Sequence, residues 1–548
     1  MTSQTHHRIR RYAKIGPAVL RALGMGAAAT DSEYFDAMRN LAFKSDDPHE
    51  FAFWYLRSEC TSKYVGVMAG GLSNDGRKAA AIESFMNGEL SCAVSNSALV
   101  DPFTRVSLNQ TVWRRARALC HEILGRWNYE EFISLCGFGP GASTGLRRKD
   151  SSQQKKWEKA AHITASALPY LLAFHKWAAI DRSGELEREI GHKVDIPSRV
   201  TVVPGNRVTT VPKSWKTDRV IAIEPDWNMF FQKGVGACIR KRLQRYGLLR
   251  KDAQNVNRRA AKHGALTGLL ATLDLKSASD SVSLALCEAL LPDEWLQHVL
   301  SLRSPVGVVE GISNPVVYEK VSSMGNGFTF ELETLLFYCL AVSACGKRAG
   351  VRVYGDDLIV PARYADRVVT TFREAGFSVN TTKSFSSGPF RESCGGHYFG
   401  FKDVTPFYLR HDVESISDAI VLHNHVLSWH STQGYHPSPE WLEVIQRCRQ
   451  VVPKKLWGPW RLPGCLWANW DECTPKWLKD EQCYRQETIS RVHLYEDLVS
   501  SCGSFLFKLW VVDSDLRSSY LARSTSKEKW SKVTVDRTAW EIVPVRTA

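Results

Sequence analysis

The segment Val351–Val360 (VRVYGDDLIV) places two adjacent acids between two apolar runs, each of which is typical of a β-strand. Asp is poorly suited to strands, and neighbouring carboxylates repel each other. Because Gly355 provides a backbone that can turn tightly, the pattern predicts a buried hairpin with Asp356 and Asp357 at its tip. Such a tip is either a surface turn or a site where a bound cation relieves the repulsion.

A third acid completes a possible cation site. The run Leu269–Leu275 is apolar and strand-like, with Asp274 close to its end. If this strand lies beside the hairpin, Asp274 and Asp356 form an oxygen cage suited to Mg²⁺. Two such ions can activate a hydroxyl and stabilise a leaving pyrophosphate in phosphoryl transfer.

Between Asp274 and Asp356 the sequence predicts two helices. A helix is expected at Val282–Leu291, capped by Ser279 or Asp280. The segment Ser322–Glu333 is a Gly-rich loop that runs into a helix. Such a loop either brings backbone N–H groups close to a ligand or is a plain junction, and the residues alone favour neither.

Charge indicates the kind of partner. The 548 residues carry a formal net charge of +14, and basic residues crowd the segment 200–263. A positive excess of this kind favours a polyanion such as nucleic acid. The C-terminal region mixes basic residues with tryptophans, which either stack on single-stranded nucleic acid or pack a core. These tryptophans are Trp457, Trp460, Trp467, Trp470 and Trp477.

No segment predicts membrane insertion or export. The N-terminus is basic and lacks the apolar stretch of a signal peptide. The most apolar run, 335–346, is too short to cross a bilayer. We therefore expect a protein that works in a cytoplasm without contact with a membrane.

In their order along the chain, these segments resemble the motifs of template-directed RNA polymerases. They resemble more closely the replicase catalytic (β) subunits of the single-stranded RNA bacteriophages, of the levivirus type. The similarity is close over about residues 200–415. The segments that carry it are Val211–Val220 (VPKSWKTDRV), Asp274, Ser323–Glu333 (SMGNGFTFELE), Tyr354–Asp357 (YGDD), Asn380–Lys383 (NTTK) and Gly388–Gly396 (GPFRESCGG).

The resemblance implies a role for each matching residue. Asp274, Asp356 and Asp357 would bind two Mg²⁺ ions, and Lys383 would donate a proton to pyrophosphate. The residues that would bind the nucleotide are Lys213, Lys216 and Arg219 for the triphosphate, with Asp280, Ser323, Gly325, Asn326 and Thr329. Two positions depart from the general pattern: Ser279 stands where an acid is usual, and Glu333 stands where Asn is frequent.

The resemblance also implies an α+β fold with fingers, a palm built on an antiparallel sheet flanked by helices, and a thumb. The expected division is 1–199 for an N-terminal region that adds to the fingers and to thumb-side packing, 200–265 for basic fingers, 266–410 for the palm and 411–548 for the thumb. The implied activity is RNA-directed RNA synthesis from ribonucleoside triphosphates. The implied partners are template RNA, host elongation factors Tu and Ts and a small-subunit ribosomal protein, in the cytoplasm of a bacterial host.

Two other kinds of protein, a reverse transcriptase and a non-catalytic RNA-binding protein, would share some of these features. A reverse transcriptase shares the palm and the paired acids, but typically has a bulky aromatic residue shortly after the first acid. Here Ala278 and Ser279 are small, which favours ribonucleotides. A non-catalytic RNA-binding protein would explain the charge through counterion release, but not the three acids.

Overall fold

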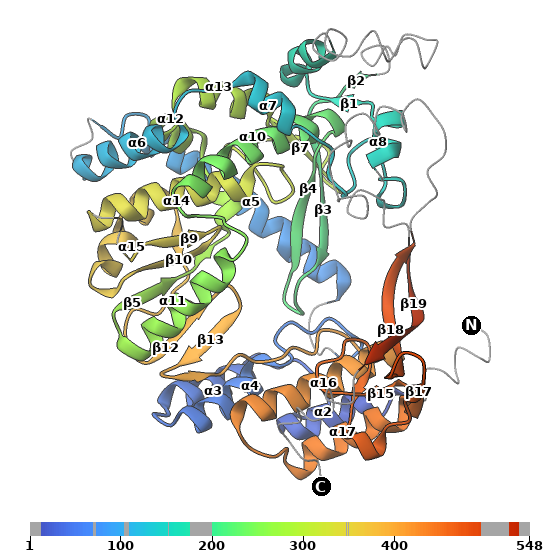
Figure 1. Ribbon diagram of the computed structural model, residues 1–548. Coiled ribbons are helices and arrows are strands. Elements are labelled where there is room, and N and C mark those ends of the chain that lie inside the picture. The colour runs from blue at the N-terminus through green and yellow to red at the C-terminus, as the bar shows by residue number, and fades with distance from the viewer. Residues whose placement is uncertain are drawn as a thin grey trace.

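The structure, a computed structural model, describes residues 12–68, 73–103, 109–151, 153–175, 200–346, 348, 350–494 and 525–535. These residues form the expected α+β fold of helices and short sheets (Figure 1), with two large apolar cores and two small apolar clusters. None of the described helices is long and apolar enough to cross a membrane.

The first core is built from residues 99–377 and contains most of the predicted motifs. At its centre lies α14 (Thr329–Cys345), which is buried along nearly its whole length because almost every residue after Glu331 is apolar or small. The neighbouring helices are α6 (Gln110–Leu124), α7 (Tyr129–Leu135), α10 (Asp226–Arg245), α12 (Leu284–Leu290), α13 (Asp293–Leu302) and α15 (Ala365–Glu374). The most apolar run of the sequence is therefore a core helix.

Three of the sheets formed by the described residues line this core and the adjoining segments and carry the predicted motifs or lie beside them. One has the order β5-β10-β9, formed by β5 (Leu270–Leu273), β10 (Asp357–Pro361) and β9 (Arg352–Tyr354). Another has the order β4-β3-β7-β8, formed by β4 (Asp218–Ile223), β3 (Asn206–Pro212), β7 (Val306–Val309) and β8 (Val316–Val317). The third pairs β11 (Ser378–Val379) with β6 (Leu275–Lys276). Helix α11 (Ala253–Thr267) packs against β5 and α5 (Asn74–Ala98) packs against β4.

The second core joins residues from the two ends of the described chain, 12–64 and 390–489. In Figure 1 the blue helices of the N-terminal part lie beside the orange helices of the C-terminal part. These helices are α2 (Ile15–Leu23), α3 (Ser32–Lys44), α4 (Pro48–Glu59), α16 (Ile416–Gln433) and α17 (Pro439–Val451). The sheet β12-β13-β14 borders this core, with β12 (Phe390–Ser393), β13 (Gly396–Phe399) and β14 (Lys402–Asp403). Farther along the chain, β17 (Lys476–Leu478), β18 (Cys483–Leu494) and β19 (Thr525–Val535) form an antiparallel sheet.

The start of the helix after Asp274 differs from the prediction. Neither Ser279 nor Asp280 caps it: Ser283 does so, accepting a hydrogen bond from the backbone N–H of Leu286. Residues 278–281 instead form a 3₁₀ turn that follows Ser277, whose φ is +48°. The chain turns tightly here before the α-helix begins, which the helical pattern did not indicate.

The C-terminal tryptophans mainly pack the second core. Trp457 is buried, and Trp460 and Trp467 pack against the core with their ring centroids 4.6 Å apart. Trp470 and Trp477 are the exceptions: their ring centroids lie 4.8 and 4.7 Å from that of Tyr484, and 42% of the surface of Trp477 is exposed. The core interpretation of these residues is therefore the better one for most of them.

Candidate active site

The strand that leads to Asp274 and the predicted hairpin are neighbours in one sheet. β10 pairs antiparallel with β5, Leu358 opposite Leu273, and with β9, Asp357 opposite Tyr354. Continuing the β5–β10 register by one residue places Asp274 opposite Asp357, beside the tip of the hairpin. The expected juxtaposition of the first acid and the acidic turn is therefore confirmed.

Helix α14 fixes the shape of the turn. The backbone N–H of Gly355 donates a hydrogen bond to Thr334 Oγ1, at 3.0 Å. Gly355 has a φ of +61°, and a Cβ atom there would lie 2.7 Å from Phe330 Cε2. Phe330 also packs edge-on against Tyr354, with ring centroids 4.9 Å apart. Glycine is required at this position both by the backbone conformation and by the close approach of α14.

Asp274 is held by the segment that carries the predicted catalytic lysine. Its Oδ2 accepts a hydrogen bond from Asn380 Nδ2 at 2.9 Å, and its backbone N–H donates to Ser384 Oγ at 3.1 Å. Burial raises the pKa of the Asp274 carboxyl to about 6, although Lys383 and the Asn380 hydrogen bond act to lower this pKa. The negative charge of Asp356 raises it further, so the two carboxylates lie within electrostatic range of each other.

The two adjacent acids of the turn have different surroundings. Asp356 is exposed, whereas Asp357 Oδ1 accepts hydrogen bonds from the backbone N–H of Cys394 at 3.1 Å and from Ser393 Oγ at 3.3 Å. Burial raises the pKa of Asp357, and the Cys394 hydrogen bond partly offsets this effect. One oxygen of Asp357 thus ties the turn to β12, while Asp356 is available to a ligand.

Three basic side chains share the electrostatic environment of Asp274 and Asp356. Lys213 and Arg219 flank the turn of the β3–β4 hairpin, and Lys383 follows β11. Desolvation, followed by the charges of Arg219 and Lys383, lowers the pKa of Lys213. Asp274 and Asp356 act on the same lysine in the opposite direction. The structure therefore brings these three cations and two carboxylates into one electrostatic environment.

Lys216 does not share this environment as closely. Its Nζ donates to Ser32 Oγ at 3.1 Å and lies 4.9 Å from the centre of the Trp215 ring. Ser32 is the first residue of α3, in the N-terminal part of the chain. Of the three cations predicted for the triphosphate, Lys216 is the one directed toward the second core.

The Gly-rich loop before α14 is packed tightly against β4. The backbone N–H of Ala222 donates to the carbonyl oxygen of Met324 at 2.8 Å. Gly325 has a φ of +124°, and a Cβ atom there would overlap the carbonyl oxygen of Ala222. This glycine therefore allows a close approach between two backbones within the protein.

Several polar side-chain atoms of the segment Ser322–Glu333 are buried without a hydrogen-bond partner among the described residues. The Ser323 carbonyl oxygen accepts from the Asn326 N–H and the Thr329 hydroxyl, at 3.1 and 3.0 Å. Among the described residues, however, no hydrogen-bond partner is present for the buried atoms Ser322 Oγ, Ser323 Oγ, Asn326 Nδ2 and Glu333 Oε1. Burying such groups without partners is unfavourable, so they are suited to receive a polar ligand.

Glu333 and Asp280 extend the acidic environment toward this segment. Burial strongly raises the pKa of Glu333, and the charges of Asp356 and Asp280 raise it further. Asp280 Oδ1 is paired with Lys320 Nζ at 2.7 Å. The sequence indicated Asp280, but it gave no sign of Lys320, which lies outside every motif.

The oxygen donors at the aspartates are compatible with a hard divalent cation. Such ions prefer carboxylate oxygens, and Mg²⁺ is commonly bound by one or two carboxylates together with substrate phosphates. The mutual effect of Asp274 and Asp356 is the repulsion that a cation relieves. Within the described ranges, no three or more His, Cys, Asp or Glu side chains are grouped as a complete ligand set.

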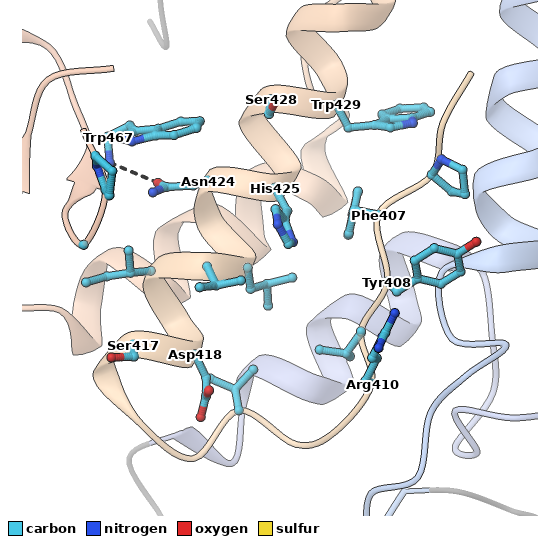
Figure 2. A pocket seen from close by; sticks show the side chains of 18 of the residues that line it. Phe407, Tyr408, Arg410, Ser417, Asp418, Asn424, His425, Ser428, Trp429 and Trp467 are labelled. Carbon is cyan, nitrogen blue, oxygen red and sulfur yellow. Dashed lines mark hydrogen bonds between the residues drawn. The ribbon is translucent and has the colours of Figure 1, made fainter. Parts of the chain in front are cut away.

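A cavity beside α16 lies apart from these residues. It has a volume of about 1050 Å³ and is lined by residues of α16, of the preceding segment 403–413 and of the loop 462–467. Figure 2 shows Asn424, His425 and Trp429 of α16 among the side chains that line this space, with Asn424 Oδ1 accepting from the backbone N–H of Trp467 at 3.1 Å. None of the predicted site residues lines it, so it is distinct from the candidate active site.

Comparison with known proteins gives one consistent result. The chain is 39% identical over 481 residues to the RNA-directed RNA polymerase subunit beta of Escherichia virus Qbeta, covering 84% of this chain and 77% of the relative. It is 38% identical to the corresponding subunit of Enterobacteria phage SP, covering 77% and 72%, and 34% identical to the RNA-directed RNA polymerase beta chain of Escherichia phage MS2, covering 78% and 77%.

These relatives identify the class of enzyme as an RNA-directed RNA polymerase, acting on template RNA and ribonucleoside triphosphates. Within that class, the chain belongs to the RNA replicase beta-chain family, which matches residues 21–464. The alternatives of a reverse transcriptase and of a non-catalytic RNA-binding protein are therefore wrong. A solved structure of the BmCPV RNA-dependent RNA polymerase at elongation state is more distantly similar, with a TM-score of 0.35 and 10% identity over 76% of this chain and 39% of that one.

Proposed function

We propose that Asp274 and Asp356 bind Mg²⁺ and form the catalytic centre of this RNA polymerase, with Asp357 assisting. The main support is the position of Asp274 beside the acidic turn, where the charge of Asp356 raises the pKa of Asp274 and both carboxylates act on Lys213, near Arg219 and Lys383. Two Mg²⁺ ions bound there would activate the 3′-hydroxyl and neutralise charge on the triphosphate.

The protein's own groups orient the reactants and balance their charge. In the reaction, the 3′-oxygen of the growing RNA forms a bond to the α-phosphorus, the bond to the β-phosphate breaks and pyrophosphate leaves. Lys213 and Arg219 bind the triphosphate oxygens, with Lys216 adding positive charge farther out. Lys383, which is exposed and acts on Asp274, donates a proton to the departing pyrophosphate.

The loop before α14 and the turn after Asp274 bind the nucleoside part. The unpartnered polar atoms of Ser323 and Asn326 support this assignment, together with the nearby Asp280. Gly325 and Thr329 keep the loop close to β4 and to α14. Small residues at 278 and 279 leave room for a ribose hydroxyl.

We further propose the division of the molecule and its setting. Residues 200–265 serve as fingers, 266–410 as the palm and 411–548 as the thumb, with 1–199 contributing to the fingers and to packing beside the thumb. By resemblance to its family, the chain works in the cytoplasm of a bacterial host and associates with elongation factors Tu and Ts and a small-subunit ribosomal protein.

The decisive experiment measures ribonucleotide incorporation on an RNA template by wild type and Asp356→Asn. Loss of one metal-binding carboxylate should reduce the rate about a hundredfold or more, since metal stabilisation of the transition state is worth several kcal/mol. Activity should require a divalent cation, with Mg²⁺ restoring it after chelation. The exposed Asp366 of α15 offers a control, because Asp366→Asn removes the same charge outside the site. Equal activity of Asp356→Asn and wild type would contradict the assignment.

A further inference from the structure

A buried lysine lies between two carboxylates at the edge of the candidate active site. Lys320 has no exposed surface, and its Nζ lies 2.7 Å from Glu89 Oε1 and 2.7 Å from Asp280 Oδ1. The same ammonium group lies 3.7 Å from the centre of the Phe85 ring. Lys320 therefore forms a buried ion triad with Glu89 and Asp280.

The triad connects three parts of the chain that are distant in sequence. Glu89 belongs to α5, Asp280 to the 3₁₀ turn after Asp274, and Lys320 to the segment that enters the loop before α14. Backbone bonds hold this segment in place: the N–H of Val321 donates to the Val282 carbonyl at 2.8 Å. The position of Lys320 thus sets both the turn and the start of the loop.

Burying the charged side chains of the Lys320 triad has a large desolvation cost. An ion pair in the interior often contributes less to stability than apolar residues of the same volume would. Removing one partner leaves the others as unpaired buried charges, which is strongly unfavourable. Stability alone is therefore a weak explanation for this triad, and its geometry points to a positioning role.

The two acids of the triad differ in where they face. Glu89 has its oxygens directed to Lys320 and to the backbone N–H of Glu319, the latter at 2.9 Å. The Glu89 side chain is 7% exposed, whereas that of Asp280 is 20% exposed. The charges of Asp356 and Asp280 both raise the pKa of Glu333. Asp280 is therefore the member of the triad that faces the candidate active site.

The unpartnered polar atoms described above begin two residues after Lys320. Ser322 Oγ and Ser323 Oγ come first, followed by Asn326 Nδ2 and Glu333 Oε1. Together with Asp280, whose charge acts on Glu333, these groups offer donors and acceptors suited to a hydroxylated ligand. Among the substrates of an RNA polymerase, the sugar of the incoming nucleotide has that chemistry.

We propose that Lys320 is a positioning residue for ribonucleotide selection, holding Asp280 and the start of the 322–333 segment against the sugar of the incoming nucleotide. The inference rests on the nucleotide-binding role proposed above for Asp280. Lys320 itself does not touch the substrate: it orients one oxygen of Asp280 and leaves the other for the ribose hydroxyls. Glu89 supports Lys320 from the side away from the substrate.

The test compares Lys320→Gln, Asp280→Asn and the double variant in steady-state incorporation of ribo- and 2′-deoxynucleotides. Lys320→Gln and Asp280→Asn should each raise the KM for ribonucleotides about tenfold, since a hydrogen bond involving a charged group is lost. The KM for deoxynucleotides should change less than about twofold, because that sugar lacks the 2′-hydroxyl. The double variant should resemble the single ones, since the two residues act as a unit.

Two further variants separate positioning from general support. Glu89→Gln breaks the other ion pair of Lys320, so it should lower Tm while leaving the ribonucleotide KM within about twofold of wild type. Lys320→Arg keeps the charge and should restore most of the ribonucleotide preference. This pair keeps the test decisive if Lys320→Gln does not fold.

The possible results are distinguishable. A fall in kcat for Lys320→Gln with unchanged KM values would overturn the inference, as would a KM change for Glu89→Gln equal to that for Asp280→Asn. If Asp280→Asn leaves the ribonucleotide KM unchanged, the proposed nucleotide contact of Asp280 is wrong, and the inference about Lys320 falls with it. If Asp280→Asn raises this KM and Lys320→Gln does not, only the positioning role of Lys320 is wrong.

Discussion

At the scale of single residues, the surroundings of each charge decide what that charge can do. Asp356 and Asp357 are adjacent, yet Asp357 accepts hydrogen bonds from Cys394 and Ser393 while Asp356 is exposed. Asp356 lies in the turn, whereas Asp357 is the first residue of β10. The step from turn to strand gives the two acids separate environments, and it favours Asp356 as the stronger partner of Asp274.

The same reasoning separates two lysines of the β3–β4 hairpin. Lys213 acts electrostatically on Asp274 and Asp356, whereas Lys216 donates to Ser32. We expect Lys213→Ala to raise the KM for nucleoside triphosphates about tenfold, the loss typical of a charged hydrogen bond. Lys216→Ala, a matched removal of charge, should raise this KM less than about threefold. Steady-state kinetics alongside filter binding of RNA would measure both effects, and a larger effect of Lys213→Ala on RNA binding than on KM would assign Lys213 to the template.

At the scale of elements, α14 connects the two sides of the candidate site. Its first turn continues from the Gly-rich loop, and its Thr334 accepts the hydrogen bond from Gly355 in the acidic turn. Phe330 fills the space beside Gly355 and Tyr354. A shift of this helix would therefore move the nucleoside-binding loop and the acidic turn together.

Gly355→Ala tests that connection. The φ of +61° disfavours a side chain, and the added Cβ would lie 2.7 Å from Phe330 Cε2, so the turn or α14 must move. We expect at least a tenfold loss of kcat and about 1–2 kcal/mol of destabilisation. Gly434→Ala is the matched control, since its φ is +79° and no atom lies within 4 Å of an added Cβ. It should lose stability alone, and equal kcat values for the two variants would show that the Phe330 contact is unimportant.

The sequence predicted the local elements of this site better than its long-range contacts. The hairpin could be predicted because its strands are consecutive and its turn residues are distinctive. The motif order, through the resemblance, also predicted Asp274 as the neighbour of the turn. The start of α12 was mispredicted because Ser277 adopts a left-handed conformation, which is rare for serine. The triad of Lys320 could not be predicted, because Glu89 and Lys320 are far apart in sequence and neither belongs to a motif.

At the scale of the whole molecule, the two apolar cores divide the chain unequally. One is built from the continuous stretch 99–377, while the other needs residues 12–64 together with 390–489. On the side of the second core, Phe43 of α3 stacks on Phe385 with ring centroids 5.7 Å apart, and the Phe385 backbone pairs with Thr272 of β5, a strand of the first core. Arg39 on the same helix donates to the carbonyl oxygen of Thr382 at 2.6 Å, next to Lys383. The N-terminal helices thus touch the segment that carries the predicted proton donor.

Phe51→Ala tests how far the second core depends on its N-terminal part. Phe51 is fully buried in α4, and its ring centroid lies 4.3 Å from that of Phe399. The substitution should cost about 3–5 kcal/mol through lost burial and a remaining cavity. Phe53→Ala on the same helix is the matched control, because Phe53 is 37% exposed and should lose about 1 kcal/mol or less. Denaturant unfolding followed by tryptophan fluorescence would measure both, and similar losses would contradict a structural role for Phe51 in joining the two segments.

The shared second core has a consequence for how the chain is made. The N-terminal end of the chain leaves the ribosome first, so the stretch 99–377 can begin to collapse while later codons are still being translated. Residues 12–64 leave the ribosome first, yet they must wait for their partners at 390–489. During that interval their apolar side chains stay exposed, which is the condition under which chaperones bind nascent chains. The order of synthesis therefore makes closure of the second core a late event, and no chain interrupted before that point can complete it.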